Sequence, residues 1–288
     1  MTRIRIVTDS TAGLTSTQQE ELGITTIPLV VRFGTDEYRE GIDISNAGFY
    51  ERLTTDSNFP STSQPSAGEF LAIYEELVKE ADSIISIHVS SELSGTCESA
   101  HTALRGTSID ATVDVIDSRS VGSGLGHLAV VAGEMAHQGA KRNEIIDAVQ
   151  QLIPNIRIGF AVKTLEYLRR GGRIGGAQAF LGSVLQLKPV LHVENGRVEP
   201  LDRTRSFGKA VHRLIRYIDD ESGGDLAHCG IMHVRNEESA EQLKSIVNQN
   251  FNVGRWYGGE LSPVVGSHVG PGMVAVSFPA TGKHAPQP

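Results

Sequence analysis

Hydroxyl side chains gather where the hydropathy pattern predicts that strands end, and they could bind an anion or act as nucleophiles. They are Ser10, Thr62, Ser94 and Ser118. Ser94 follows a buried strand predicted over residues 84–89 and precedes a predicted helix, so it is a candidate N-cap. Free N–H groups at a helix start favour anions. The plain alternative is a capped helix start that binds no ligand.

A second set of residues could support acyl hydrolysis. Ser94, His268 and Asp9 are a candidate triad, because such groups need only be close in space. The Gly-x-Ser-x-Gly elbow is absent, since Glu92 and Leu93 precede Ser94. His268 stands in a glycine-rich segment, residues 266–272, which we expect to be a tightly shaped functional loop before a strand.

The spacing of the histidines and of the cysteines gives little support for a metal site or for a reactive thiol. The histidine pairs His127 with His137 and His228 with His233 lack i, i+4 spacing and acidic neighbours, so we expect no metal site. The two cysteines, residues 97 and 229, lie far apart in sequence. We expect free thiols in a cytoplasmic protein.

Two arginine groups could hold a carboxylate or a phosphate. The segment 169–173 carries three arginines around two glycines, and Arg203 and Arg205 follow a predicted hairpin. A solvated surface is the alternative. The chain as a whole has a net charge of -8, which argues against a general nucleic-acid binder. No apolar run approaches the ~18 residues of a membrane span, and the N-terminus lacks a signal peptide's apolar core.

The elements that would position these residues fall into two groups. Up to residue 152, buried strands alternate with helices, which predicts βα units around a parallel sheet. The predicted strands span 4–8, 24–31, 84–89 and 111–116, and capping boxes begin helices at Thr15 and Ser66. The prolines of segment 60–66, which contains Thr62, predict a loop.

After Pro154 and Asn155 the pattern changes. A hairpin signal at Asn195-Gly196, strands at 158–162, 229–234 and 273–278, and a helix predicted over 177–186 indicate an α+β domain with a mixed sheet. We therefore expect an α/β chain of two domains: a parallel-sheet domain over residues 1–155, a mixed-sheet domain over 156–281, and a disordered tail at 282–288.

Several of these segments in their order resemble the DegV family of bacterial fatty-acid-binding proteins. The likeness runs from about Ile4 to Phe278, and it rests on the following segments: residues 8–12, 60–65, 91–96, 117–118, 165–174 and 266–272. The resemblance implies a two-domain, cytoplasmic protein without catalytic residues or cofactor. It would hold one long-chain fatty acid between its domains, its tail in an apolar tunnel.

The resemblance also implies a role for individual residues. Thr62 and Ser94 would hydrogen-bond the carboxylate, and His268 would lie near the head group. Arg170 and Arg203 would serve the head group or the contact with a partner. That partner would be a separate ATP-dependent fatty acid kinase, which forms an acyl phosphate for phospholipid synthesis. Contact with a membrane surface would be transient. The length of fatty acid that fits would depend on where the tunnel closes. The side chains that could close it are Phe180, Leu181, Leu185 and Leu187.

The sequence departs from the family pattern at Asp202, where a neutral or basic residue is expected beside Arg203. Two other functions stay open at this point. One is a serine acyl hydrolase that uses Ser94 and His268. The other is a binding module for a small anionic metabolite, which would carry no lipid.

Overall fold

The computed structural model describes residues 3–106, 109, 112–182 and 187–280. The N-terminal half holds a four-stranded sheet, order β2-β1-β6-β7, in which every pair is parallel. Its strands are β1 (Ile4–Asp9), β2 (Ile24–Ile27), β6 (Ser83–His88) and β7 (Thr112–Asp117). The predicted parallel sheet is confirmed.

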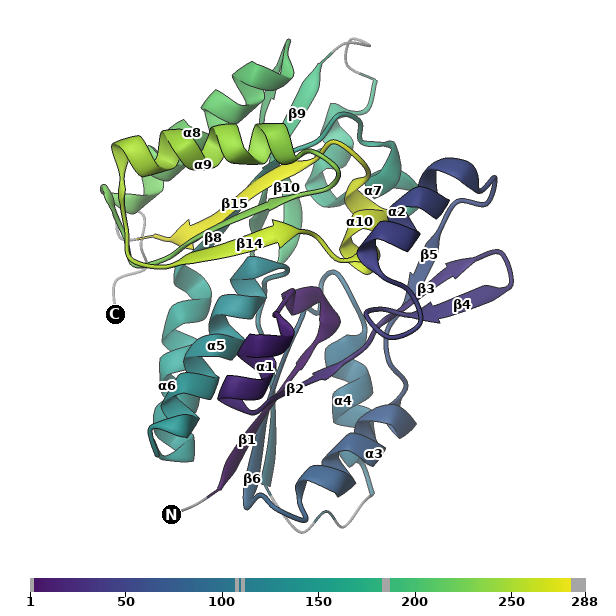
Figure 1. Cartoon of the computed structure of the whole chain (residues 1–288), viewed down its shortest axis with the longest axis vertical. Helices are drawn as coiled ribbons and strands as arrows, with labels where there is room; N and C mark the ends of the chain where they lie inside the picture. The colour runs from purple at the N-terminus through teal and green to yellow at the C-terminus, as the bar shows by residue number, and fades with distance from the viewer. Residues whose placement is uncertain (1–2, 107–108, 110–111, 183–186, 281–288) are drawn as a thin grey trace.

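Helices cover both faces of this sheet because its apolar residues alternate between the two faces (Figure 1). Ile6 and Ile85 pack with the helices α1 (Ser16–Leu22), α5 (Ser123–His137) and α6 (Arg142–Leu152). Val7 and Ile84 pack with α3 (Ala67–Leu77) and α4 (Thr96–Leu104) on the other face. The two predicted capping boxes, at the starts of α1 and α3, are confirmed.

The C-terminal half holds a six-stranded mixed sheet with the order β10-β9-β8-β15-β12-β14. Only the β12–β14 pair is parallel. The strands are β8 (Ile156–Ala161), β9 (Lys188–Glu194), β10 (Arg197–Thr204), β12 (Cys229–His233), β14 (Trp256–Glu260) and β15 (Val274–Pro279). The hairpin turn at Asn195-Gly196 is confirmed, with φ of 50° and 82°.

One face of the mixed sheet packs on α8 (Phe207–Ser222) and α9 (Glu237–Asn250), while the other face looks toward the N-terminal half (Figure 1). Phe160, Met232 and Ala275 point to the inner face, and their neighbours Ala161, Ile231 and Val274 point to the helices. Beside this sheet, β11 (Asp225–Leu226) pairs with β13 (Asn252–Val253).

A third, small antiparallel sheet stands apart from the two larger ones. It consists of β3 (Val30–Phe33), β4 (Asp36–Arg39) and β5 (Ser61–Ser63), and it is accompanied by α2 (Asn46–Thr55). The single strand predicted over 24–31 is therefore wrong, because the chain breaks at Pro28-Leu29 and changes sheets. The loop predicted over 60–66 is also corrected, since Ser61–Ser63 pair with β3.

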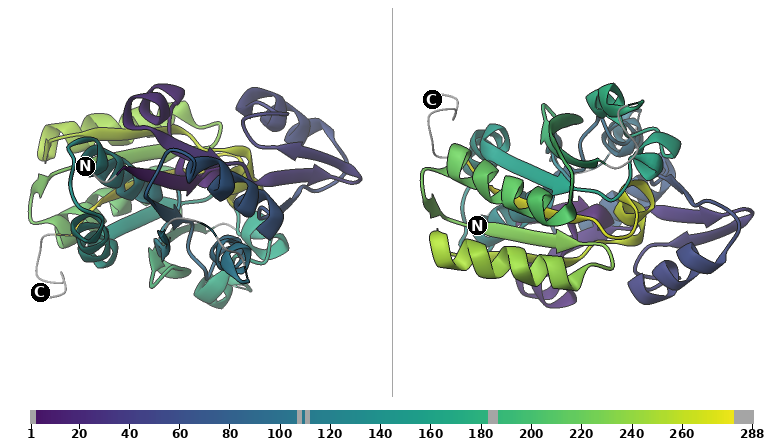
Figure 2. Two further views of the ribbon diagram at one scale, coloured as in Figure 1. Left: turned by 90° about the horizontal axis from the view of Figure 1, so that it is seen from below. Right: turned by 90° about the horizontal axis from the view of Figure 1, so that it is seen from above.

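This small sheet and α2 lie against the C-terminal half, where they project at one side of the molecule (Figure 2). The hydroxyl of Tyr50 donates to the Leu261 carbonyl at 2.7 Å, and Glu40 Oε1 accepts from the Val264 amide at 2.7 Å. Val264 belongs to α10 (Pro263–Val269). The N-terminal chain thus holds the start of a C-terminal helix.

Short elements complete the chain: 3-10 helices η1 (Ser10–Ala12), η2 (Ile153–Asn155) and η3 (Gly175–Phe180), and helix α7 (Glu166–Arg170). The helix predicted over 177–186 is corrected to η3, and residues 183–186 lie outside the described residues. So does the predicted tail, 282–288. Because the two larger sheets use residues 4–117 and 156–279, we propose the domain division at residue 155.

Candidate functional site

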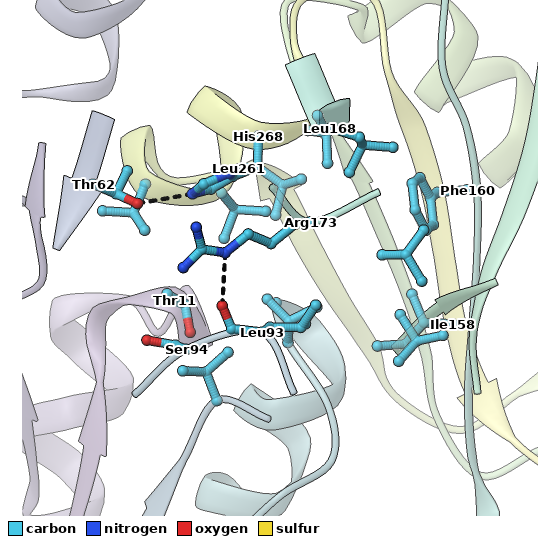
Figure 3. A pocket seen from close by; sticks show the side chains of 18 of the residues that line it. Thr11, Thr62, Leu93, Ser94, Ile158, Phe160, Leu168, Arg173, Leu261 and His268 are labelled. Atoms are coloured by element: carbon cyan, nitrogen blue, oxygen red, sulfur yellow. Dashed lines mark hydrogen bonds between the residues drawn. The ribbon is translucent and has the colours of Figure 1, made fainter. Parts of the chain in front are cut away.

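A cavity lies between the two halves of the chain, under the inner face of the mixed sheet (Figure 3). Together with the solvent space at its mouth, the cavity takes in about 860 Å³ that no protein atom fills. Most of its lining is aliphatic or aromatic, including Ile158, Phe160 and Leu168. Such a lining suits an apolar ligand and offers it no hydrogen bonds.

Polar side chains gather at one end of the cavity, where Thr62 meets His268 (Figure 3). Thr62 Oγ1 lies 2.8 Å from His268 Nε2, although 206 positions separate them in the chain. Strand β5 supplies the threonine and α10 the histidine. The predicted 266–272 loop is corrected here, because His268 lies in the last turn of a helix.

Gly171 makes room for the His268 ring. A Cβ atom at position 171 would lie 2.2 Å from His268 Nδ1. Burial and, to a smaller extent, the nearby Arg173 together lower the pKa of His268 to about 4. The ring is therefore neutral at pH 7. Within the described part of the chain, its Nδ1 is buried and has no hydrogen-bond partner.

Arg173 brings a positive charge into the same end of the cavity (Figure 3). Its Nε donates to the Leu93 carbonyl at 2.8 Å and its Nη1 to the Gly171 carbonyl at 2.7 Å. Burial lowers the pKa of Arg173, yet a guanidinium of this type stays charged at neutral pH. The two carbonyls hold the guanidinium in place, and its charge suits an anion at this end.

Ser94 and Thr11 complete the polar end. Ser94 Oγ lies 2.9 Å from Thr96 Oγ1. Gly95, not Ser94, is the N-cap of α4, so the predicted capping role is wrong. Thr11 is fixed by Asp9, whose carboxylate accepts from the Thr11 amide at 3.1 Å and also from its hydroxyl. Thr11 can therefore offer the cavity only an oxygen acceptor.

The candidate hydrolase triad is not assembled. His268 bonds Thr62 rather than Ser94, and Asp9 Oδ2 lies 3.2 Å from Nδ1 of another histidine, His88. His88 Nε2 lies 2.7 Å from Ser86 Oγ, so a serine, a histidine and an aspartate do align in the core. All three are 0% exposed. This alignment cannot meet a substrate and ties β1 to β6.

Comparison with known proteins agrees with this architecture. Residues 3–281 match the family model described as "Uncharacterised protein, DegV family". The chain belongs to the DegV family. It is 36% identical to Protein DegV of Bacillus subtilis over 282 residues, which cover 96% of this chain and 98% of that protein.

Solved structures of DegV proteins share the fold over their whole length. A DegV family protein from Thermus thermophilus, whose structure is described as showing fatty acid binding, has a TM-score of 0.88 at 32% identity. The comparison covers 96% of this chain and 99% of that chain. DegV of Bacillus subtilis, described as a fatty acid binding protein, has a TM-score of 0.87 at 34% identity, with coverage of 98% and 100%.

The DegV resemblance named five site residues, of which the structure brings three to the cavity. Thr62, Ser94 and His268 line it, whereas Arg170 and Arg203 do not. Arg170 is exposed and its guanidinium lies 3.9 Å above the Phe59 ring. Arg203 lines two other hollows on the C-terminal half.

Arg173, and not Arg170, is the arginine of segment 169–173 that lines the cavity. Both lie in the arginine segment, but Arg170 ends α7, and after Gly171 and Gly172 the chain turns so that Arg173 meets Leu93. A φ of 72° at Gly172 marks the turn. In the sequence, the two glycines before Arg173 are the feature that indicates this turn. Phe180, Leu181 and Leu187 line the hollow beside Arg203 rather than the cavity, and Leu185 lies outside the described residues.

Cysteine is not among the described residues that line the cavity of this DegV protein. Among the described residues no group of three or more histidine, cysteine or acidic side chains could hold a metal ion. Cys97 and Cys229 are free and buried, and burial raises the pKa of each thiol to about 12. The described helices include none that is long and apolar enough to cross a membrane.

Proposed function

We propose that this protein binds one long-chain fatty acid in the cavity, with the carboxylate at the Thr62–His268 end. The observation that carries the proposal is the distribution of polarity: an aliphatic cavity that ends in hydroxyls and the Arg173 guanidinium. An amphiphile with a long apolar chain and one anionic head matches both ends. The DegV structures described as fatty-acid-binding add support.

The apolar lining would supply most of the affinity. Each buried CH₂ contributes about 0.8 kcal/mol, so ~14 methylenes offer on the order of 11 kcal/mol before the entropy cost of binding. Losing one hydrogen bond at the head costs roughly 1–3 kcal/mol. The head-group residues would therefore determine the orientation of the acid more than its retention.

The polar end can satisfy a carboxylate. A buried charge needs hydrogen bonds or an opposite charge. If His268 Nε2–H donates to Thr62 Oγ1, the threonine hydroxyl proton is free to point at the ligand. Ser94 is a second hydroxyl donor and Arg173 supplies the positive charge. Thr11 accepts only, so it would face a protonated or bridging group.

We further propose that the bound carboxylate is presented to a separate ATP-dependent fatty acid kinase, which would form an acyl phosphate for phospholipid synthesis. A basic hollow supports a docking partner with an acidic surface. It contains Arg203, Arg205, Lys209 and Arg216, which form no ion pair with the acidic side chains described. The departure at Asp202 is explained by its bond to Arg213, 3.1 Å long. Because the kinase would use ATP, the proposal places this step in the cytoplasm.

The other two hypotheses fit the cavity less well. A small anionic metabolite would leave the aliphatic lining without a ligand group to contact. A serine hydrolase would need His268 at Ser94, and His268 is bonded to Thr62.

Mass spectrometry of an organic extract of the purified protein tests the binding proposal. We expect about one long-chain fatty acid per chain. If no fatty acid co-purifies and none is taken up on addition, the proposal fails. A fatty acid kinase catalytic subunit with Mg-ATP and hydroxylamine then tests presentation, through formation of acyl hydroxamate. Ser94→Ala should retain lipid but form much less acyl hydroxamate. Ser91 lies outside the cavity, so Ser91→Ala should retain lipid and form as much acyl hydroxamate as the wild type.

A further inference from the structure

Glu40 is a buried acidic residue that does not line the cavity, yet it bonds the helix that carries His268. It is 5% exposed, and it follows β4 directly in the chain. Its Oε1 accepts from the Val264 amide at 2.7 Å, in the first turn of α10. Burial of a carboxyl group is costly unless the group is hydrogen-bonded. The bond to α10 is therefore the contact that Glu40 is buried to make.

Helix α10 lacks an N-cap bond of its own and obtains one from Glu40. Its first residue, Pro263, has no backbone N–H, and its N-cap residue, Ser262, forms no side-chain bond with the helix. The Val264 amide is thus the first free donor of the helix. Glu40 Oε1 accepts from this amide as an N-cap side chain would. In a helix of seven residues, this one bond holds the first turn.

The first turn of α10 and the His268 ring are coupled through the helix. Val264 and His268 are four positions apart, so they lie on the same helix face, and both line the cavity. Between them, Ser267 Oγ donates to the Pro263 carbonyl at 2.8 Å. A displacement at Val264 would therefore be carried to His268.

One small sheet supplies both Thr62 and Glu40. Thr62 lies in β5 and pairs with Val31 of β3, while Glu40 follows β4, which pairs with the other edge of β3. The Glu40 amide also donates to the Leu29 carbonyl at 2.9 Å, just before β3 begins. The sheet thus holds Thr62 directly, and it holds His268 through Glu40 and α10. The two supports meet where Thr62 Oγ1 contacts His268 Nε2 (Figure 3).

The acceptor oxygen of Glu40 matters more here than a negative charge. Burial and, to a smaller extent, the charge of Asp9 raise the pKa of Glu40, while the hydrogen bond from the Val264 amide lowers it. Burial disfavours the charged form of a carboxyl group. A glutamine has the same length and keeps an acceptor oxygen. Glu40→Gln therefore separates the acceptor from the charge.

We propose that Glu40 is a positioning residue for the head-group end of the cavity: by bonding the start of α10, it holds His268 where the ring meets Thr62. This inference rests on the proposed fatty-acid function and adds to it a residue outside the cavity. Without the bond to Val264, α10 shifts and the His268 ring leaves Thr62. The threonine hydroxyl is then no longer oriented toward the carboxylate.

Competition binding of palmitate and methyl palmitate to delipidated variants tests the proposal. In Glu40→Leu we expect the affinity for palmitate relative to its methyl ester to fall at least fivefold below the wild-type ratio, as for the loss of one carboxylate hydrogen bond. Glu40→Gln should stay within twofold of the wild-type ratio. Asn46→Leu is the matched control and should also stay within twofold. Asn46 Nδ2 donates to the Leu261 carbonyl at 3.2 Å, so it links the same two parts of the chain without bonding α10.

A double-mutant cycle shows whether Glu40 acts through Thr62. In the Thr62→Val background the threonine hydroxyl is already absent, so Glu40→Leu should lower the ratio less than twofold further. A second measurement needs no ligand. The ¹⁵N chemical shifts of the His268 ring should differ from those of the wild type in Glu40→Leu and match them in Glu40→Gln.

A wild-type ratio in Glu40→Leu, with its thermal unfolding still cooperative, would overturn the positioning role. Additive losses in the cycle would also overturn it, as would an equal loss in Glu40→Gln or in Asn46→Leu. If Glu40→Leu does not fold, Glu40→Ala provides the measurement, with the same fall expected. Failure of the wild-type protein to bind palmitate would instead contradict the proposed function, and the His268 chemical shifts would still test the role of Glu40.

Discussion

Replacement of Arg173 by methionine is the most direct test of how the cavity holds an anion. Methionine keeps an unbranched apolar chain but removes the charge that Arg173 brings between the carbonyls of Leu93 and Gly171. Two charges 4 Å apart interact by about 4 kcal/mol at an effective dielectric of 20. Arg173 is only partly buried, so solvent screening lowers this to about 1–3 kcal/mol. We therefore expect palmitate to bind about 5- to 150-fold more weakly at pH 8.

The assay separates charge from packing by the choice of ligand. Competition binding would use palmitate, and the methyl ester of the same acid as the neutral ligand. The loss should fall on the acid alone, because the ester has no charge for the guanidinium to balance. Arg170→Met is the control, since Arg170 lies in the same segment but outside the cavity, over the Phe59 ring. Equal losses for acid and ester, or wild-type affinity for the acid, would refute the reasoning.

Three further outcomes follow from the geometry. Thr62→Val should weaken palmitate binding by about 1–3 kcal/mol, since a carboxylate hydrogen bond is lost, while methyl palmitate binding in the same competition assay should change less. Gly171→Ala should displace the ring of His268, which lies 2.2 Å from the added Cβ; we expect weaker palmitate binding with the melting temperature lowered by a few degrees at most, and an unchanged affinity would contradict the crowding. Burial lowers the pKa of His127 to about 4 and that of His228 to about 3. Both values lie below the unfolded value of about 6.5, so above pH 6.5 the two rings are neutral in both states and the free energy of unfolding is highest. As the pH falls toward 4 the unfolded chain binds protons more readily than the folded chain, and the free energy of unfolding decreases, by up to about 3 kcal/mol for His127. Denaturant unfolding from pH 7 to pH 4 should show a shallower loss in His228→Phe than in the wild type.

The last outcome depends on a contact between the two halves of the chain. His127 in α5 stacks on His228, with ring centroids 3.4 Å apart. The sequence spacing of His127 with His137, and of His228 with His233, predicts no metal site and gives no sign of this stack. The stack joins residues 101 positions apart, so no local spacing reveals it.

The sequence by itself determined the elements whose signals are local. Capping boxes at Thr15 and Ser66, the Asn195-Gly196 turn and the apolar strand predicted over 84–89 are each specified by residues a few positions apart, and the structure confirms them. The alternation of strands and helices before residue 152 determined the parallel sheet for the same reason, because each strand is buried on both faces. The ordered motifs determined the family.

Only the tertiary structure decided which side chains share the cavity. Residues 61–63 became a strand because β3 offered a free edge, and that pairing carries Thr62 to His268. The turn at Gly171-Gly172 directed Arg173 inward and left Arg170 outside, a choice that depends on the Leu93 carbonyl 80 positions away. Such pairings arise from contacts that are distant in sequence, so the composition of a segment predicts its residues' chemistry but not their neighbours.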